Sequence, residues 1–82
     1  MKITLLFFAS LRDRLKTNRL ELDLPGGTVQ DALDHLGSRH PEVRDLLARI
    51  HTAVNEEYRE KDAPLREGDV LALIPPVSGG GR

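Results

Sequence analysis

Apolar residues repeat at strand spacing in the first part of the chain. After Lys2, every position of residues 2–8 is apolar or β-branched, which predicts a central strand covered on both faces. Residues 19–24 alternate strictly between charged residues and leucines, the pattern of an antiparallel strand with one exposed face. Leu11 and Leu15 lie four residues apart between these segments and predict a short helical turn. We therefore expect two paired strands joined by a helical turn.

The middle of the chain has helical spacing. One apolar stripe predicts a first helix facing a sheet, with Thr28 as its N-cap, Asp31 as a capping-box partner and Gly37 at its end. A second stripe predicts a following helix that begins at Pro41. The stripes consist of Val29, Ala32, Leu33 and Leu36, and of Val43, Leu46, Leu47 and Ile50. This segment is therefore a helical crossover in two parts.

The last third of the chain returns to strand patterns. Residues 52–54 predict a short strand, which a turn at residues 55–56 closes because asparagine tolerates turn geometry. Residues 67–69 predict a tight turn, and residues 70–74 form the most continuous apolar run of the chain. We expect this run to be a strand buried on both faces, ended by the proline pair 75–76 because proline has no N–H for the ladder.

The order of these elements predicts the fold class. The first and last strands both have the pattern of central strands, so they are most simply placed side by side in parallel, with the helical crossover packed on one face. This arrangement is an α+β, ubiquitin-like β-grasp fold with a mixed sheet of four to five strands. We expect residues 1–77 to form this single domain and residues 78–82 to form a glycine-rich C-terminal tail.

Charge and composition exclude several classes of function. Lysine and arginine number 12 against 13 aspartate and glutamate residues, and the two signs are interspersed, so nucleic acid is not an expected partner. The apolar run at the N-terminus is too short to span a membrane. Cysteine is absent, which excludes thiolate sites and fits a cytoplasmic protein. His35, His40 and His51 lack the spacing of metal ligands, so we expect no metal and no self-contained active site.

The C-terminal segment carries the candidate chemistry. After Pro76 the side chains shrink through Val77 and Ser78 to a run of glycines, and such a segment can enter a channel too narrow for other residues. The four residue steps from Pro76 to Gly80 span roughly 13 Å, enough to reach into a partner. Glycine-rich chain ends are also commonly inert, and composition alone favours that simpler interpretation.

A family resemblance changes this balance. Residues 5–13 (LLFFASLRD), residues 53–58 (AVNEEY) and especially residues 65–80 (LREGDVLALIPPVSGG) resemble the MoaD/ThiS sulfur carriers, the family of the molybdopterin synthase small subunit. The similarity covers nearly the whole chain, although the middle helices match only in pattern. The resemblance implies a β-grasp fold and a C-terminal glycine that carries sulfur.

The resemblance also implies cofactors, partners and residue roles. A ubiquitin-activating-type enzyme uses ATP to adenylate the terminal glycine, and a sulfurtransferase or cysteine desulfurase supplies persulfide sulfur for a thiocarboxylate. Carried over by position, Gly80 bears the sulfur, while Ser78, Gly79 and Gly80 insert into the molybdopterin synthase large subunit. That subunit binds cyclic pyranopterin monophosphate and supplies the catalytic residues. The chain would then be a non-catalytic, sulfur-donating subunit, expected in a heterotetramer of two small and two large subunits.

The sequence departs from the family pattern at the sulfur-bearing end. Gly81 and Arg82 follow Gly79–Gly80, and a thiocarboxylate cannot form on an internal glycine whose carbonyl is in a peptide bond. A protease could trim the chain to Gly80, Gly81 could serve after loss of Arg82 alone, or the chain could be part of a fusion. Our hypothesis is that trimming to Gly80 precedes activation.

The docking surface and two rival functions complete the expectations. Exposed members of an apolar set near the tail are candidates for docking, namely Phe7, Phe8, Leu73, Pro75, Pro76 and Val77. Strand alternation places the two phenylalanines on opposite faces, so one should belong to the core. The nearest rival is a carrier for thiamine or another pathway, or a ubiquitin-like modifier. A rival of another class is a non-enzymatic β-grasp interaction module with an inert tail.

Overall fold

A computed structural model describes residues 1–76, and residues 77–82 lie outside the described part. Within residues 1–76 the chain forms five strands, three α-helices and one 3-10 helix. In chain order these are β1 (Lys2–Phe7), α1 (Ala9–Leu15), β2 (Arg19–Asp23), α2 (Val29–Arg39), η1 (Pro41–Val43), α3 (Arg44–Leu47), β3 (His51–Val54), β4 (Glu57–Tyr58) and β5 (Val70–Ile74).

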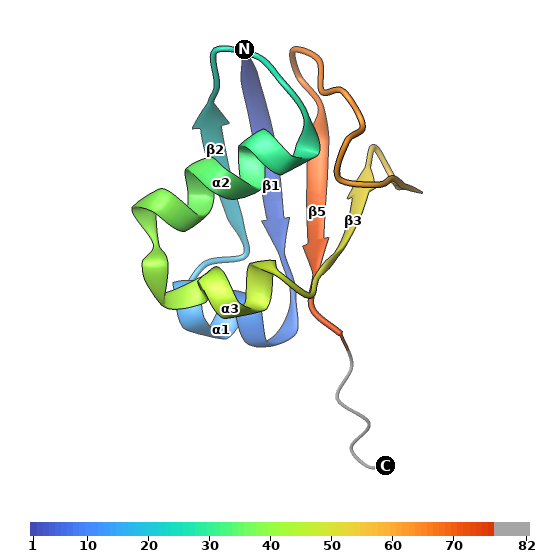
Figure 1. Cartoon of the computed structure of the whole chain (residues 1–82). Coiled ribbons are helices and arrows are strands. Elements are labelled where there is room, and N and C mark those ends of the chain that lie inside the picture. Colours follow the sequence, from blue (N-terminus) through green and yellow to red (C-terminus); the bar gives the residue numbers. More distant parts are fainter. Residues whose placement is uncertain (77–82) are drawn as a thin grey trace.

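The strands form one mixed sheet in the order β2-β1-β5-β3-β4. β1 and β5 are parallel neighbours, with Thr4 opposite Val70, whereas the other strand pairs are antiparallel. α2 crosses one face of the sheet, and α1 and α3 lie together near one end of the strands (Figure 1). The predicted β-grasp fold, with its first and last strands side by side, is therefore confirmed.

The core lies between α2 and the sheet face that it covers. β1 contributes Ile3, Leu5 and Phe7 to this core, and β5 contributes Leu71 and Leu73. Both apolar stripes of the helical crossover face it as well, except that Leu46 is only partly buried. Burying these side chains is the main source of stability for a domain of this size.

The opposite face of the sheet differs from the prediction. Thr4 and Leu6 of β1, and Ala72 and Ile74 of β5, are only half-buried, so the expectation that these strands are covered on both faces is wrong. In the part of the chain that the structure describes, no helix crosses this second face (Figure 1). An unbroken apolar run shows that both faces are apolar, but not what covers the second one.

Residues at both ends of α2 explain its limits. The Thr28 hydroxyl accepts a hydrogen bond from the Asp31 N–H at 3.4 Å, and the Asp31 carboxylate accepts one from the Thr28 N–H at 2.8 Å. This confirms the capping box. Gly37 does not end the helix as predicted, since α2 continues to Arg39. Gly37 is instead buried, and a Cβ there would lie 3.3 Å from the Cγ atom of Arg44.

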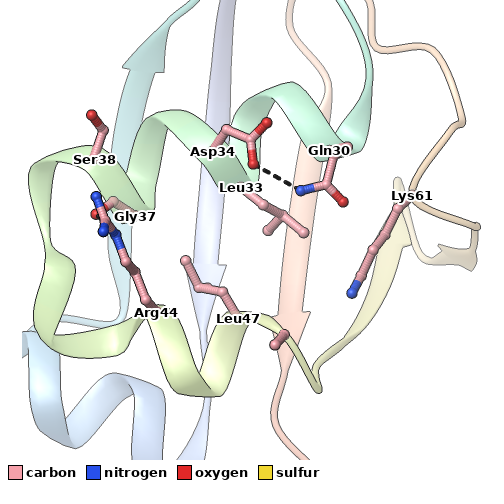
Figure 2. A pocket seen from close by; sticks show the side chains of 9 residues that line it. Gln30, Leu33, Asp34, Gly37, Ser38, Arg44, Leu47 and Lys61 are labelled. Atoms are coloured by element: carbon pink, nitrogen blue, oxygen red, sulfur yellow. Dashed lines mark hydrogen bonds between the residues drawn. The ribbon is translucent and has the colours of Figure 1, made fainter.

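Arg44 is expected to stabilise the C-terminal end of α2. In a continuing helix the Gly37 carbonyl would accept from the N–H of residue 41, but Pro41 has none. The Arg44 Nε donates to this carbonyl at 3.0 Å instead, and Figure 2 shows its guanidinium beside Gly37. Arg44→Met keeps the aliphatic stem and removes the donor, so urea unfolding should show a loss of about 1 kcal/mol. Arg49→Met, at an exposed position, is the control, and equal losses in both variants would contradict this role.

Candidate functional site

One edge of the sheet gathers the carboxyl ends of its two central strands. Because β1 and β5 are parallel, Phe7 and Ile74 lie at the same end of the strands. We call this end of the sheet the tail edge. β3 begins there too, with His51 opposite Ile74. Beyond Ile74 the chain continues through Pro75, which is buried, to Pro76, which is exposed. The glycine tail therefore follows directly from a residue at the tail edge.

The far end of β5 is anchored by Asn55, in the turn between β3 and β4. Its side-chain Oδ1 accepts from the Val70 N–H at 3.0 Å, and its Nδ2 donates to Asp69 at 2.9 Å. The other oxygen of the Asp69 carboxylate accepts from the Arg66 N–H at 2.8 Å. Asn55 has a φ of 51°, in the left-handed region that asparagine tolerates. These hydrogen bonds hold the start of β5 in register with β3. They therefore help to set the position of Ile74, where β5 ends.

Sequence reasoning treated Asn55 only as a turn residue and missed this anchor. The signal was weak, because a carboxylate 14 residues further along, Asp69, shows its role only once the two turns are brought together. Residues 53–58 nevertheless belong to one of the segments on which the family resemblance was based. The anchor gives a structural reason for the asparagine in that segment.

The sheet face opposite α2 carries the exposed aromatic residues. Cross-strand pairing and alternation place the following side chains on this face, which we call the open face: Leu6, Phe8, Tyr58, Val70, Ala72 and Ile74. Phe8 is 42% exposed and Tyr58 is 76% exposed, and they are the exposed large hydrophobic residues of the described chain. An apolar strip across an uncovered sheet is the kind of surface that docks another protein.

The backbone after β1 presents Phe8 on this face. Phe8 is extended, and Ala9 then takes a φ of 51° in the left-handed region. That conformation costs a residue other than glycine roughly 1–2 kcal/mol. The turn sends the chain away into α1, whose Leu11 packs in the core, and leaves the Phe8 ring outside. Local strain at a candidate binding surface is consistent with a functional role for that surface.

The structure divides the predicted docking residues into two groups. Phe7 is 1% exposed, Leu73 is fully buried and Pro75 is buried too, so these three are not among the exposed members of the predicted set. Phe8 and Pro76 are exposed. The opposite placement of the two phenylalanines is confirmed. The remaining predicted site residues lie outside the described residues: Val77, Ser78, Gly79, Gly80 and Gly81.

Other hollows lie on different parts of the molecule. A groove of about 600 Å³ runs between α2 and α3, floored by Leu33 and Leu47, with Arg44 and Lys61 near its ends (Figure 2). A second hollow of about 860 Å³ lies beside β3 and β4. Within residues 1–76, no group of three or more histidine, aspartate and glutamate side chains is placed to hold a metal ion. The same residues include no helix long and apolar enough to cross a membrane. We therefore take the open face and the tail edge as the candidate site.

Comparison with known proteins identifies relatives of the whole domain. The model of the ThiS family matches residues 5–80. The molybdopterin synthase sulfur carrier subunit of Arabidopsis thaliana is 37% identical over 81 residues, which cover 98% of this chain and 84% of that protein.

Two solved structures show the same fold. SAMP1 from Haloferax volcanii superposes with a TM-score of 0.86 at 30% identity, covering 98% of this chain and all of that one. A chain of the Amycolatopsis orientalis BexX/CysO complex superposes with a TM-score of 0.71 at 26% identity, covering 95% of this chain and 99% of that one. The family match includes the glycine pair beyond the tail edge as well as the β-grasp domain. The chain therefore belongs to the ThiS/MoaD family of sulfur carriers.

Proposed function

We propose that this chain is the sulfur carrier subunit of a molybdopterin synthase. The observation that carries the proposal is the family match over residues 5–80, which joins the β-grasp domain to the Gly79–Gly80 pair. The Arabidopsis relative, which is similar over nearly the full length of this chain, bears that name. Among the functions open to the family, this one also agrees with the LIPPVSGG segment at residues 73–80.

The proposed chemistry begins with activation of the Gly80 carboxylate. A resting carboxylate is a poor electrophile, so an ATP-dependent adenylating enzyme joins it to AMP and releases pyrophosphate. The terminal sulfur of a persulfide, held by a sulfurtransferase or cysteine desulfurase, then attacks the acyl carbon and AMP leaves. A second thiol reduces the resulting acyl disulfide, leaving a thiocarboxylate on the chain and a disulfide on the donor. The thiocarboxylate is a soft nucleophile held at the end of a narrow arm.

Delivery requires a partner that accepts the arm. We assign this role to a large synthase subunit that binds cyclic pyranopterin monophosphate and supplies the catalytic residues. The open face is the docking surface for that subunit, because Phe8 and Ile74 lie at the tail edge beside the start of the tail. The CysO relative is likewise found in a complex with a second protein, BexX. Because adenylation consumes ATP, we place the cycle in the cytoplasm, and we expect two small and two large subunits in the assembled synthase.

Processing of the chain end belongs to the same proposal. Gly81 and Arg82 hold the Gly80 carbonyl in a peptide bond, which no adenylating enzyme can activate as a carboxylate. We infer that a protease removes both residues before activation. Removal of Arg82 alone would instead place the reactive carboxyl on Gly81.

Reconstitution tests the proposed acceptor. The chain ending at Gly80, loaded as the thiocarboxylate, is mixed with the large synthase subunit and cyclic pyranopterin monophosphate. We expect formation of the dithiolene product, with return of the carrier to its carboxylate form in intact-mass spectra. The carrier in its carboxylate form is the control and should yield no product. A thiocarboxylate that persists in the presence of a large subunit active with its own carrier would refute the assignment.

A second function is favoured by one observation. SAMP1 is named a small archaeal modifier protein in another of its solved structures, and it matches this fold over almost the whole chain. A modifier would transfer its activated C-terminus to lysine amines and form isopeptide bonds. Incubating the activated chain with cell extract and searching for its C-terminal remnant on lysines separates the two functions. Such remnants, together with no transfer to the pyranopterin, would favour the modifier.

A further inference from the structure

The small net charge conceals a separation of charge along the molecule. Residues 9–19, at the tail edge, carry four cations against one carboxylate: Arg12, Arg14, Lys16 and Arg19 against Asp13. Residues 55–57 and 65–69, at the opposite end where β5 begins, carry one cation against four carboxylates: Arg66 against Glu56, Glu57, Glu67 and Asp69. These two regions have formal net charges of +3 and −3, a separation that the value of −1 for the whole chain does not reveal.

The fold brings these segments to opposite ends. β1 and β5 point toward the tail edge, so the connection from β1 to β2 lies there together with Pro76. The turns at residues 55–56 and 66–69 lie at the other end of β5. Figure 1 shows α1 at the end of the molecule where β5 finishes, and the N-terminus at the other end. The glycine tail therefore starts from the positive end.

Two of these cations belong to the open face itself. Arg19 is paired with Leu6 across β2 and β1, so its side chain lies on the open face. Arg12 and Arg19 both line a hollow of about 240 Å³ with Leu6 and Phe8. The exposed Phe8 at the tail edge therefore shares a hollow with two arginines.

The ion pairs of these two arginines are loose. Arg12 lies 3.9 Å from the Asp13 carboxylate, and Arg19 lies 3.7 Å from the Glu21 carboxylate, with both side chains more than half exposed. Such exposed pairs contribute little to stability. Arg14 differs, because it donates to the Asp45 carboxylate at 3.1 Å and to the Glu42 carbonyl at 2.9 Å, which ties α1 to the crossover. Arg12 and Arg19 are thus the cations best placed to bind a partner's carboxylates.

We propose that the tail edge docks a protein whose entrance for the glycine tail is rimmed by carboxylates, with an apolar seat for Phe8 between groups that bind Arg12 and Arg19. The partner is one that takes the tail, so this inference rests on the proposed function. The charge separation orients the carrier before contact, positive end and tail first, and the acidic loops at the far end are repelled by the same rim. Steering of this kind raises association rates by roughly 10- to 1,000-fold at low ionic strength.

The association rate with the adenylating enzyme tests the steering. The chain ending at Gly80 is mixed with the enzyme in a stopped-flow instrument at about 0.02 M and about 0.2 M salt, which changes the screening length severalfold. We expect the wild-type rate constant to fall at least about tenfold with salt, and the double variant Arg12→Glu, Arg19→Glu to show a similar loss at low salt. The matched control is Lys2→Glu, Arg66→Glu, which makes the same change in net charge at the far end, where the Lys2 carbonyl accepts from the Gly68 N–H. The association rate constant of this control at low salt should stay within about twofold of the wild-type value.

Equal slowing of both double variants, or a wild-type rate independent of salt, would overturn the inference. A second measurement needs no natural partner: a short polyglutamate peptide is titrated into the labelled chain, and amide shifts are followed by NMR. We expect shifts at residues 8–19 and none at residues 55–69, and shifts centred on Arg59 and Lys61 would overturn the inference. If the peptide shifts occur as expected but the chain never associates with the enzyme, the proposed function fails while the acidic-rim surface stands.

Discussion

Removing residues 79–82 is expected to abolish thiocarboxylate formation while leaving the free energy of unfolding within about 0.5 kcal/mol of the parent chain. The physical reason is that the residues of the hydrophobic core and the residues that carry the reactive acyl group lie in different parts of the chain. The buried cluster is complete at Leu73, the sheet ends at Ile74, and Pro75 is the last buried residue that the structure describes. The four deleted residues contain the acyl group that must be activated, so their loss removes the reaction and not the fold.

A series of chain ends makes this prediction specific. The chain ending at Gly80 should gain one sulfur atom, as a thiocarboxylate, when it is incubated with ATP, the adenylating enzyme and the persulfide donor. The 82-residue chain should gain none until it is trimmed. A chain ending at Gly80 with Gly79→Ala is the matched variant, because it keeps the carboxyl and adds one methyl group to the arm. We expect it to be activated more slowly, since the added Cβ meets the walls of a channel shaped for glycine. Intact-mass analysis measures each product, and efficient loading with Arg82 still attached would rule out trimming to Gly80.

Much of the fold could be predicted because local patterns and global topology agree. The alternation of Arg19–Asp23 predicted an antiparallel strand with one exposed face. β2 is that strand, and it is the outermost strand on one side of the sheet. Thr28 and Asp31 form the capping box that their spacing indicated. The parallel pair of β1 and β5 followed from two strongly apolar strands at opposite ends of the chain. A fold can be predicted from a sequence when the local patterns of its segments agree with the topology of the whole domain.

The failures have physical causes in particular residues. Gly37 resembled a helix end because glycine commonly follows helices, but here its missing Cβ lets Arg44 and Leu47 approach closely. The half-exposed face of β1 and β5 resembled a buried one because its side chains, which we propose contact a partner, are as apolar as those of the core. Leu6 and Ile74 are therefore informative, since their apolar character is not explained by burial within this chain.

The candidate site was only partly predictable for the same reason. The glycine tail could be found from sequence because its composition and the family motif are both unusual. The roles that we propose for Arg12 and Arg19 could not, because these residues are seven positions apart and come to line one hollow only when α1 folds back and β2 pairs with β1. Likewise, Phe7 and Phe8 could be assigned to opposite faces, but sequence alone did not say which face was covered.

Phe8→Asp is expected to weaken docking to the large synthase subunit by about 100-fold or more while leaving the fold intact. Exposed aromatic anchors commonly account for 2–4 kcal/mol of an interface. An aspartate at this position would place a carboxylate in the apolar seat, and its attraction for Arg12 and Arg19 would compete with the acidic rim inferred above. Because Phe8 is already 42% exposed, its loss removes little core packing. Titration calorimetry measures the affinity, and thermal unfolding shows that the domain remains folded.

Its neighbour Phe7 provides the contrast. Phe7→Ala removes a ring that is 1% exposed in the core, so it should cost about 3–5 kcal/mol of unfolding free energy, a large share of what a domain of this size has. Phe8→Leu keeps an apolar side chain beside Arg12 and should recover most of the affinity. The two adjacent phenylalanines would then have separate roles. Phe7 would stabilise the fold, and Phe8 would bind the partner. If Phe8→Asp binds the large subunit as tightly as the parent chain, the open face is not the docking surface.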